Sequence, residues 1–263
     1  MIQYLEKKYN INLNDFDSII NLKDLRKEVQ EYRNKYNKNL EYKKKYLCII
    51  CNNDKYGSGF FASITYKSKP LNVLITNNNI IDNNKIEIYL NYENNKKIIY
   101  LDNQRKKYSN KEMNLFIIEI KESDKIKYFL KVDKEIVNYY NSKTIKDDII
   151  NYFNEIYINN LIFTLNYKDK YNIFISNGLL SGINEEGIEH TCKMGEISFI
   201  NEKFLCSPIL LLKSKKLIGF YNGGKSNYGK LIIFPIIEFN KIPDIIQQEY
   251  EGKMEIKKFK YDK

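Results

Sequence analysis

Short runs of β-branched and aromatic residues, separated by Asn, Lys, Asp and Gly, make up the chain from residue 46 onward. Many short runs at such regular spacing predict the strands of a β-sandwich or β-barrel. The runs form two groups of six, separated by residues 140 to 155, and no internal sequence repeat relates the groups. The predicted strands are 46–52, 58–66, 71–76, 85–91, 97–101 and 115–120, then 160–166, 171–176, 188–193, 208–213, 216–221 and 230–236. The pattern predicts an all-β protein built from two halves.

Helical spacing precedes the strands, where apolar residues recur after an N-cap residue, Asn21, at Leu22, Leu25, Val29, Tyr32 and Tyr36. We expect this helix to pack on the domain behind it; a docking or dimerisation helix is the alternative, for which only a few heptads are present. Two further short helices are predicted at Ile145–Phe153 and Pro243–Tyr250. The predicted organisation is an N-terminal helical extension at 1–44, a first β lobe at 45–140, a linker at 141–155, a second β lobe at 156–241 and a C-terminal helix with a charged tail at 242–263.

Composition narrows the function classes only slightly. With 263 residues and 43% hydrophobic content, the chain can bury a substantial core. The net charge of +10 would suit nucleic acid or an anionic membrane surface. However, the lysines are scattered and accompany no nucleic-acid motif, so we do not favour nucleic acid as a partner. No signal peptide and no apolar stretch long enough to span a membrane is visible, which predicts a cytoplasmic protein.

Four cysteines in such a protein are expected to be reduced. Zinc is the alternative, with Cys48-x-x-Cys51 and His190-x-Cys192 as ligands. Cys48 and Cys51 lie in a predicted strand, where residues three apart point to opposite faces, so they could not easily share one metal ion. We therefore predict no metal and no cofactor.

A family resemblance begins at residues 57–82, where G-S-G-F-F is followed by L-I-T-N-N-N. This segment resembles the G-[ST]-G-F-F … L-I-T-N-N-H-V segment of intracellular trypsin-like serine peptidases, which have the chymotrypsin fold of the PA clan. The resemblance extends over about residues 46 to 240. It implies two six-stranded antiparallel β-barrels, and a catalytic triad in the order base, carboxylate, nucleophile.

All three triad positions depart from the family pattern. The histidine position is Asn79, and the aspartate position, in Y-S-N-K-E-M-N, is Asn114. The nucleophile position is Leu205, in K-F-L-C-S-P-I where the family has G-[SD]-S-G-[SG]-P-[IL]. Lys203 and Cys206 replace the glycines of that loop, and Ser207 is the serine that follows the second glycine. An amide cannot take and return a proton near neutral pH, so Asn79 cannot be the general base.

No other residue is an obvious substitute for the triad. Cys206 is one position past the nucleophile, and Ser207 is normally structural. Ser198 lacks the flanking glycine that a nucleophile loop needs, and His190 is interpreted as structural. Triad members act as a unit, so their joint loss predicts an inactive enzyme.

The leading hypothesis is therefore a non-catalytic trypsin-like protease homologue, or pseudoprotease, that binds an unidentified protein or an extended peptide. The predicted binding cleft between the lobes includes Tyr221, Asn222, Gly223 and Gly224, where the resemblance implies pairing with an extended peptide. Alternatives are a residual or altered serine-type endopeptidase, a basic nucleic-acid binder, and a decaying paralogue without a selected role.

Overall fold

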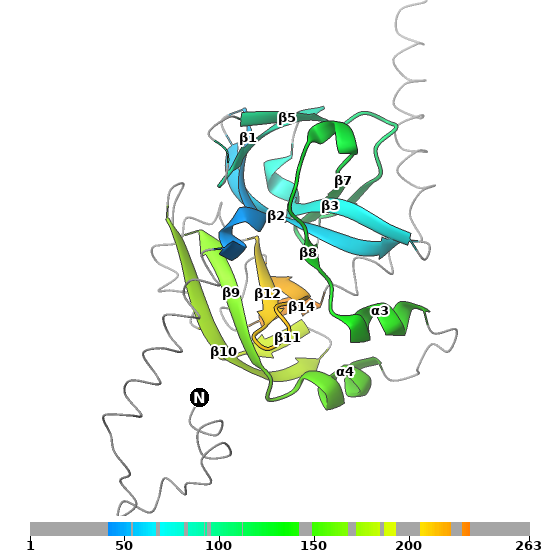
Figure 1. Ribbon diagram of the computed structural model, residues 1–263, viewed down its shortest axis with the longest axis vertical. Coiled ribbons are helices and arrows are strands. Elements are labelled where there is room, and N and C mark those ends of the chain that lie inside the picture. Colours follow the sequence, from blue (N-terminus) through cyan, green and yellow to red (C-terminus); the bar gives the residue numbers. More distant parts are fainter. Residues whose placement is uncertain are drawn as a thin grey trace, which may run out of the picture. The chain divides into compact units, whose positions relative to one another are not determined.

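The computed structural model of this chain describes residues 42–53, 55–66, 69–81, 84–91, 93, 96–111, 113–141, 149–167, 172–184, 187–192, 206–221 and 228–231. Most of these residues are in β-strands, which form two antiparallel sheets (Figure 1). The helices predicted near residues 22–36 and 243–250 lie outside the described residues.

The first sheet has eight described strands. They are β1 (Leu47–Asn52), β2 (Lys55–Tyr66), β3 (Lys69–Asn77), β4 (Lys85–Leu90), β5 (Lys96–Tyr100), β6 (Lys107–Asn110), β7 (Leu115–Glu119) and β8 (Leu130–Lys131). Their order across the sheet is β5-β4-β1-β2-β3-β7-β6, and β8 pairs in parallel with β2. Three single-turn 3₁₀ helices accompany them: η1 (Tyr42–Tyr46), η2 (Asn78–Ile80) and η3 (Glu122–Asp124).

The second sheet is a closed barrel of six strands. They are β9 (Leu161–Tyr167), β10 (Ile173–Asn184), β11 (Gly187–His190), β12 (Ser207–Leu211), β13 (Leu217–Tyr221) and β14 (Tyr228–Leu231). Their order around the barrel is β10-β11-β14-β13-β12-β9. Along the chain, α3 (Lys134–Asn141) and α4 (Ile149–Tyr157) follow β8 and precede β9.

The two lobes repeat one strand order, although no sequence repeat relates them. In the barrel, the strands pair in the order first, second, third, sixth, fifth, fourth. The first lobe gives the same order when β5 and β6 are counted as two pieces of one interrupted fifth strand. The predicted all-β, two-lobed antiparallel fold is therefore confirmed.

The strand counts differ in detail from the prediction. The first lobe has eight described strands rather than six, because β6 and β8 were not predicted. Only Tyr108 is buried in the four-residue β6, and β8 has two residues, so neither leaves an alternating pattern in the sequence. The predicted bridging helix, 145–153, overlaps α4, which ends later, at Tyr157.

The core of the first lobe follows from strand alternation. Alternate residues of β1, β4 and β7 point inward and form one apolar cluster with inward residues of β2, β3 and β5. Fully burying a large aliphatic or aromatic side chain stabilises a fold by about 1.5–3 kcal/mol. Members of the cluster that are completely buried include Cys48, Ile50, Phe61, Leu74, Ile86, Ile88, Ile99 and Ile118.

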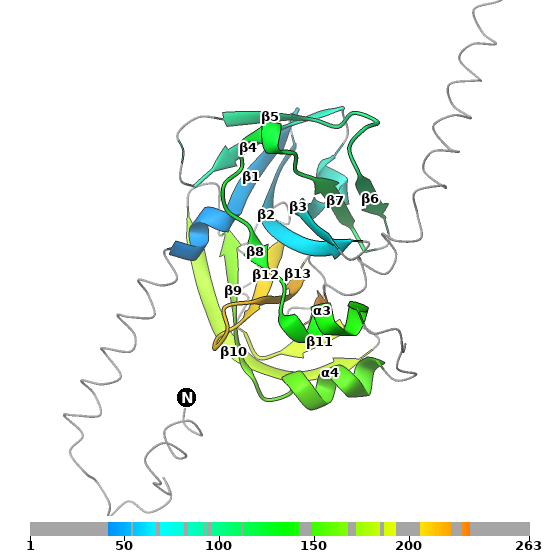
Figure 2. The ribbon, with the colours of Figure 1, turned by 45° about the vertical axis from the view of Figure 1, so that its right-hand side comes forward.

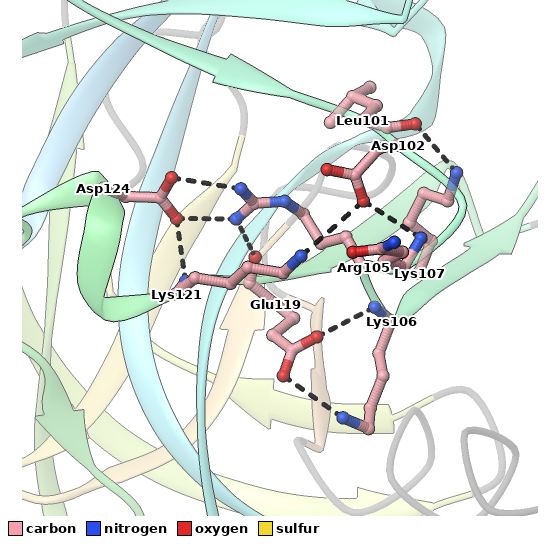
Figure 3. Close-up of polar contacts among 9 residues, drawn as sticks. Leu101, Asp102, Arg105, Lys106, Lys107, Glu119, Lys121 and Asp124 are labelled. Carbon is pink, nitrogen blue, oxygen red and sulfur yellow. Dashed lines mark hydrogen bonds and ion pairs between the residues drawn. The ribbon is translucent and has the colours of Figure 1, made fainter.

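A buried ion pair joins the β5–β6 connection to η3 (Figure 3). The guanidinium of Arg105 donates to both carboxylate oxygens of Asp124, at 2.6 and 3.0 Å, and to the carbonyl of Glu119 at 2.7 Å. Asp124 also accepts the main-chain N–H of Lys121. Because Arg105 and Asp124 are almost fully buried, each charge depends on the other for its stability.

The chain passes from the first sheet to the barrel through Val132 and Asp133. Val132 forms a parallel bridge with Leu217 of β13, and the N–H of Asp133 donates to the Leu217 carbonyl at 2.9 Å. The buried Asp133 carboxylate accepts the Tyr157 hydroxyl of α4 at 2.8 Å. These bonds hold the start of α3, the end of α4 and β13 together.

Helix α4 is fixed to the barrel by a side-chain amide. Asn154 donates to the Ile183 carbonyl and accepts the Ile183 N–H, both at 2.7 Å, so it pairs with β10 as a strand residue would. Figures 1 and 2 show α4 beside β10 in both views.

Candidate functional site

The asparagine-rich turn that follows β3 contacts the turn that precedes β7. The N–H of Asn78 donates to the main-chain carbonyl of Asn114 at 3.1 Å, and the N–H of Asn79 donates to the Asn114 side-chain oxygen at 3.0 Å. Asn114 has a φ of 46°, in the left-handed region that Asn adopts more readily than most residues. The two asparagines predicted at the base and carboxylate positions are therefore neighbours.

Asn79 is exposed, and its main-chain carbonyl accepts a hydrogen bond from the ammonium group of Lys55 at 3.2 Å. A carboxamide can donate and accept hydrogen bonds, but it neither gains nor loses a proton near neutral pH. As described, the pair can position a ligand but cannot activate a nucleophile.

The second lobe approaches this region through Cys206. The Ser58 hydroxyl of β2 donates to the Cys206 carbonyl at 3.2 Å and accepts the Cys206 N–H at 3.1 Å. The Cys206 thiol contacts the carbonyl of Ile75 at 3.5 Å, and Thr76 donates to the Ser58 carbonyl at 2.8 Å. Cys206 is thus packed on the end of β3 that leads into the turn at Asn79.

Sequence reasoning missed Asn77. Its side chain is fully buried, and neither its oxygen nor its nitrogen has a hydrogen-bond partner. On β3, Asn77 shares a face with Val73 and Ile75, which are also fully buried. Leu74 and Thr76, on the other face, are fully buried too, so the signal available in the sequence was an amide that ends an apolar run buried on both faces.

Several predicted site residues lie outside the described residues: Lys203, Leu205, Asn222, Gly223 and Gly224, together with Ser198. Tyr221 is described, and it is 2% exposed at the end of β13, opposite Ser207. Tyr221 therefore offers almost no exposed surface to a ligand in this structure.

The other candidate nucleophiles are sealed from solvent. Cys206 and Ser207 are each 1% exposed. Burial raises the pKa of the Cys206 thiol far above its ordinary value, so the thiolate that would attack a substrate does not form near neutral pH. Burial likewise raises the pKa of Cys192 to about 12.

His190, the only histidine of the chain, is on β11 of the barrel and is 1% exposed. Burial lowers its pKa to about 4, and neither ring nitrogen makes a hydrogen bond. An acid or base catalyst must reach the reacting proton, and a ring enclosed in this way does not reach solvent.

Metal-ligating side chains do not gather in the described residues: no three His, Cys, Asp or Glu side chains lie together as a metal site would require. On β1, Cys48 belongs to the inner core cluster, whereas Cys51 lies on the opposite face of the strand. In the described part of the chain, no helix has the length and apolar character needed to cross a membrane.

Comparison with known proteins finds similarity among solved structures and none among protein families or curated proteins. A structure titled "Crystal structure of Deg5" is 14% identical and covers 76% of this chain and 90% of its own, with a TM-score of 0.48. The serine endoprotease from Yersinia pestis is 10% identical and covers 79% of this chain and 67% of its own, with a TM-score of 0.49. At these values, neither similarity carries a function to this chain.

Proposed function

We propose that this chain is a non-catalytic homologue of the trypsin-like serine peptidases, which binds a protein or an extended peptide between its two lobes. The observation that carries the proposal is the placement of the one histidine. It is enclosed in the second barrel, while the position at which the family places its base is an exposed asparagine bonded to a second asparagine.

The alternative of a residual hydrolase would need a nucleophile and a base. The thiol and hydroxyl next to the nucleophile position, at Cys206 and Ser207, are buried, and Ser58 engages the main chain of Cys206. Since a triad works as a unit, loss of its base, its carboxylate and its nucleophile removes on the order of 10⁶ in turnover in well-studied serine proteases.

Peptide binding requires less of the site than catalysis. An extended peptide gains affinity from main-chain hydrogen bonds to a strand, and from pockets for alternate side chains. Neither contribution depends on a proton transfer, so replacement of the triad by amides and leucine leaves this mode of binding intact.

A fluorophosphonate probe tests the absence of chemistry. We expect no labelling of the full chain, since a probe of this kind needs an activated serine. Labelling of the wild-type chain would contradict the proposal, and labelling that persists after Ser207→Ala and Cys206→Ala would also make the assigned nucleophile position wrong. An active trypsin in the same reaction is the positive control.

A displayed library of extended peptides tests binding. We expect selected peptides to lose affinity for Asn222→Trp, which places a bulky ring at the predicted cleft. Lys213→Trp, in the exposed turn at the other end of the β12–β13 hairpin, is the matched control. Failure to select any peptide, or equal loss in both variants, would refute binding at the cleft.

A further inference from the structure

Strand β5 ends the described first sheet, and it pairs with β4 alone (Figures 1 and 2). Lys85 lies opposite Tyr100, and the N–H of Leu101 donates to the carbonyl of Asn84 at 2.7 Å. In an antiparallel pair, main-chain groups point toward the partner strand at every second residue. Since Leu101 is hydrogen-bonded to β4, the main-chain groups of Lys97 and Ile99 also point toward β4. The main-chain groups of the residues between them point away from the sheet.

The outward-pointing residues are Lys96, Ile98 and Tyr100. Within the described part of the chain, no hydrogen bond occupies the main-chain N–H or C=O of Ile98 or Tyr100 on this outer edge. The nearby single-turn helix η3 makes no hydrogen bond to them. An exposed row of unpaired donors and acceptors is a template for a further strand.

The side chains of the same residues form an exposed apolar face. Ile98 is 41% exposed and Tyr100 is 61% exposed. Tyr56, which is 36% exposed, lies on the same face of the sheet, separated from Ile98 by Glu87 and Cys51. Three of the four large hydrophobic side chains that are exposed among the described residues thus share one face of one sheet. Ile98 and Tyr100, which are neighbours on this face of the edge strand, are the exposed apolar residues that a partner at this edge can cover.

The charged residues beside this edge indicate the charge of the partner. Glu87 pairs with Lys96 at 2.9 Å, and Glu93 pairs with Lys97 at 3.1 Å. Lys85, across from Tyr100, has no salt bridge within the described residues, and the whole chain carries +10. An acidic partner complements this edge, whereas a second copy of the chain is repelled by like charge.

We infer that the outer edge of β5 binds an extended acidic peptide whose apolar residues alternate, by adding it to the sheet as a strand. The main chain of the peptide pairs with Ile98 and Tyr100, and its apolar side chains continue their exposed face. This edge shares no residue with the predicted cleft, so the inference stands or fails independently of the proposed function.

Amide exchange measured by NMR on the full chain tests the inference, with a fluorophore-labelled peptide of alternating valine and glutamate as the probe. In the free protein, we expect the amides of Lys97 and Ile99 to exchange slowly and those of Ile98 and Tyr100 to exchange fast. Adding the peptide should slow Ile98 and Tyr100 alone. The same peptide with lysine in place of glutamate should not bind.

Two variants locate the binding. Ile98→Pro removes the outward N–H without removing a bond to β4, so we expect affinity for the peptide to fall about tenfold or more with the fold preserved. Ile98→Asn removes the apolar side chain and serves if the proline variant does not fold. Ile158→Asn is the matched control, because Ile158 is also 41% exposed and lies at the end of α4.

Several outcomes would overturn the inference. They are no binding of the valine–glutamate peptide, equal binding of the lysine peptide, and unchanged affinity in both Ile98 variants. Loss of binding in Asn222→Trp but not in the Ile98 variants would place the peptide in the cleft instead. A concentration-dependent dimer that Ile98→Pro abolishes would make a second copy the occupant.

Discussion

Replacing His190 should remove an acid-sensitive contribution to stability. In the folded chain, burial lowers the pKa of this imidazole from an ordinary value of 6.5 to about 4. The unfolded chain therefore binds a proton in the range between those two values that the folded chain does not. The free energy of unfolding is unaffected when the pH is above the pKa of the unfolded chain. It falls as the pH falls between the two pKa values, and it levels off below the pKa of the folded chain.

The size of the effect follows from the two pKa values. One pKa unit corresponds to about 1.4 kcal/mol, so protonation of the unfolded state alone costs the fold roughly 2 kcal/mol at about pH 5 and about 3 kcal/mol at the lower end of the window. Carboxylates titrate in the same range. The informative quantity is therefore the difference between the wild type and His190→Leu, in which those other contributions cancel.

Urea unfolding at a series of pH values measures this difference. The chain has 23 tyrosines and no tryptophan, so tyrosine fluorescence or circular dichroism reports the transition. We expect the wild type to lose about 2 kcal/mol more than His190→Leu on going from neutral pH to about pH 5. Parallel pH profiles of the two proteins would refute the reasoning, since they would mean that the folded ring is protonated as readily as an exposed one.

Other substitutions probe the packing and the contact between lobes, each measured by urea unfolding. Arg105→Met leaves the buried Asp124 carboxylate unpaired and should cost about 3–5 kcal/mol, whereas Arg105→Met combined with Asp124→Leu should recover much of the loss; equal stability of the single and double variants would contradict this. Gly178→Ala should destabilise strongly, because its Cβ would lie 2.4 Å from a main-chain nitrogen, while Gly182→Ala, with 3.5 Å to its nearest neighbour, should be tolerated; similar costs at both sites would be the contrary result. Ser58→Ala leaves the buried N–H and carbonyl of Cys206 without their hydrogen-bond partner and should cost about 1–3 kcal/mol of stability. No loss of stability would show that these two groups find other partners.

The sequence pattern predicted the strands that are apolar runs bounded by polar residues, such as β1 and β13, and it failed where tertiary contacts set the length of the strand. β10 shows the limit. It runs from Ile173 to Asn184, twice the predicted 171–176, because Asn177 and Gly178 resemble a turn. Gly178 lies within the strand, and glycine is needed there because the main chain at Cys192 comes too close for any side chain. Such an approach depends on a residue far along the sequence, so no local pattern contains it.

The candidate site was less predictable than the fold. The proximity of Asn79 and Asn114, which are 35 positions apart, came from family resemblance and not from any spacing of residues. The contact of Ser58 with Cys206 spans 148 positions and depends on how two lobes meet. Propensity and periodicity describe neighbours along the chain, whereas these bonds depend on tertiary arrangement. The assignment of Asn79, Asn114 and Leu205 as former triad positions stays a prediction.

The bond between Asn79 and Asn114 has a consequence for how this region responds to its surroundings. A histidine beside an aspartate changes charge across the physiological range, and an enzyme that uses them works only within a band of acidity. A main-chain N–H and a carboxamide oxygen keep the same hydrogen bond at every pH in which the chain is folded. A ligand held by this pair would therefore be bound equally well in neutral and mildly acidic surroundings. The region would act as a constant feature of the surface rather than as a sensor.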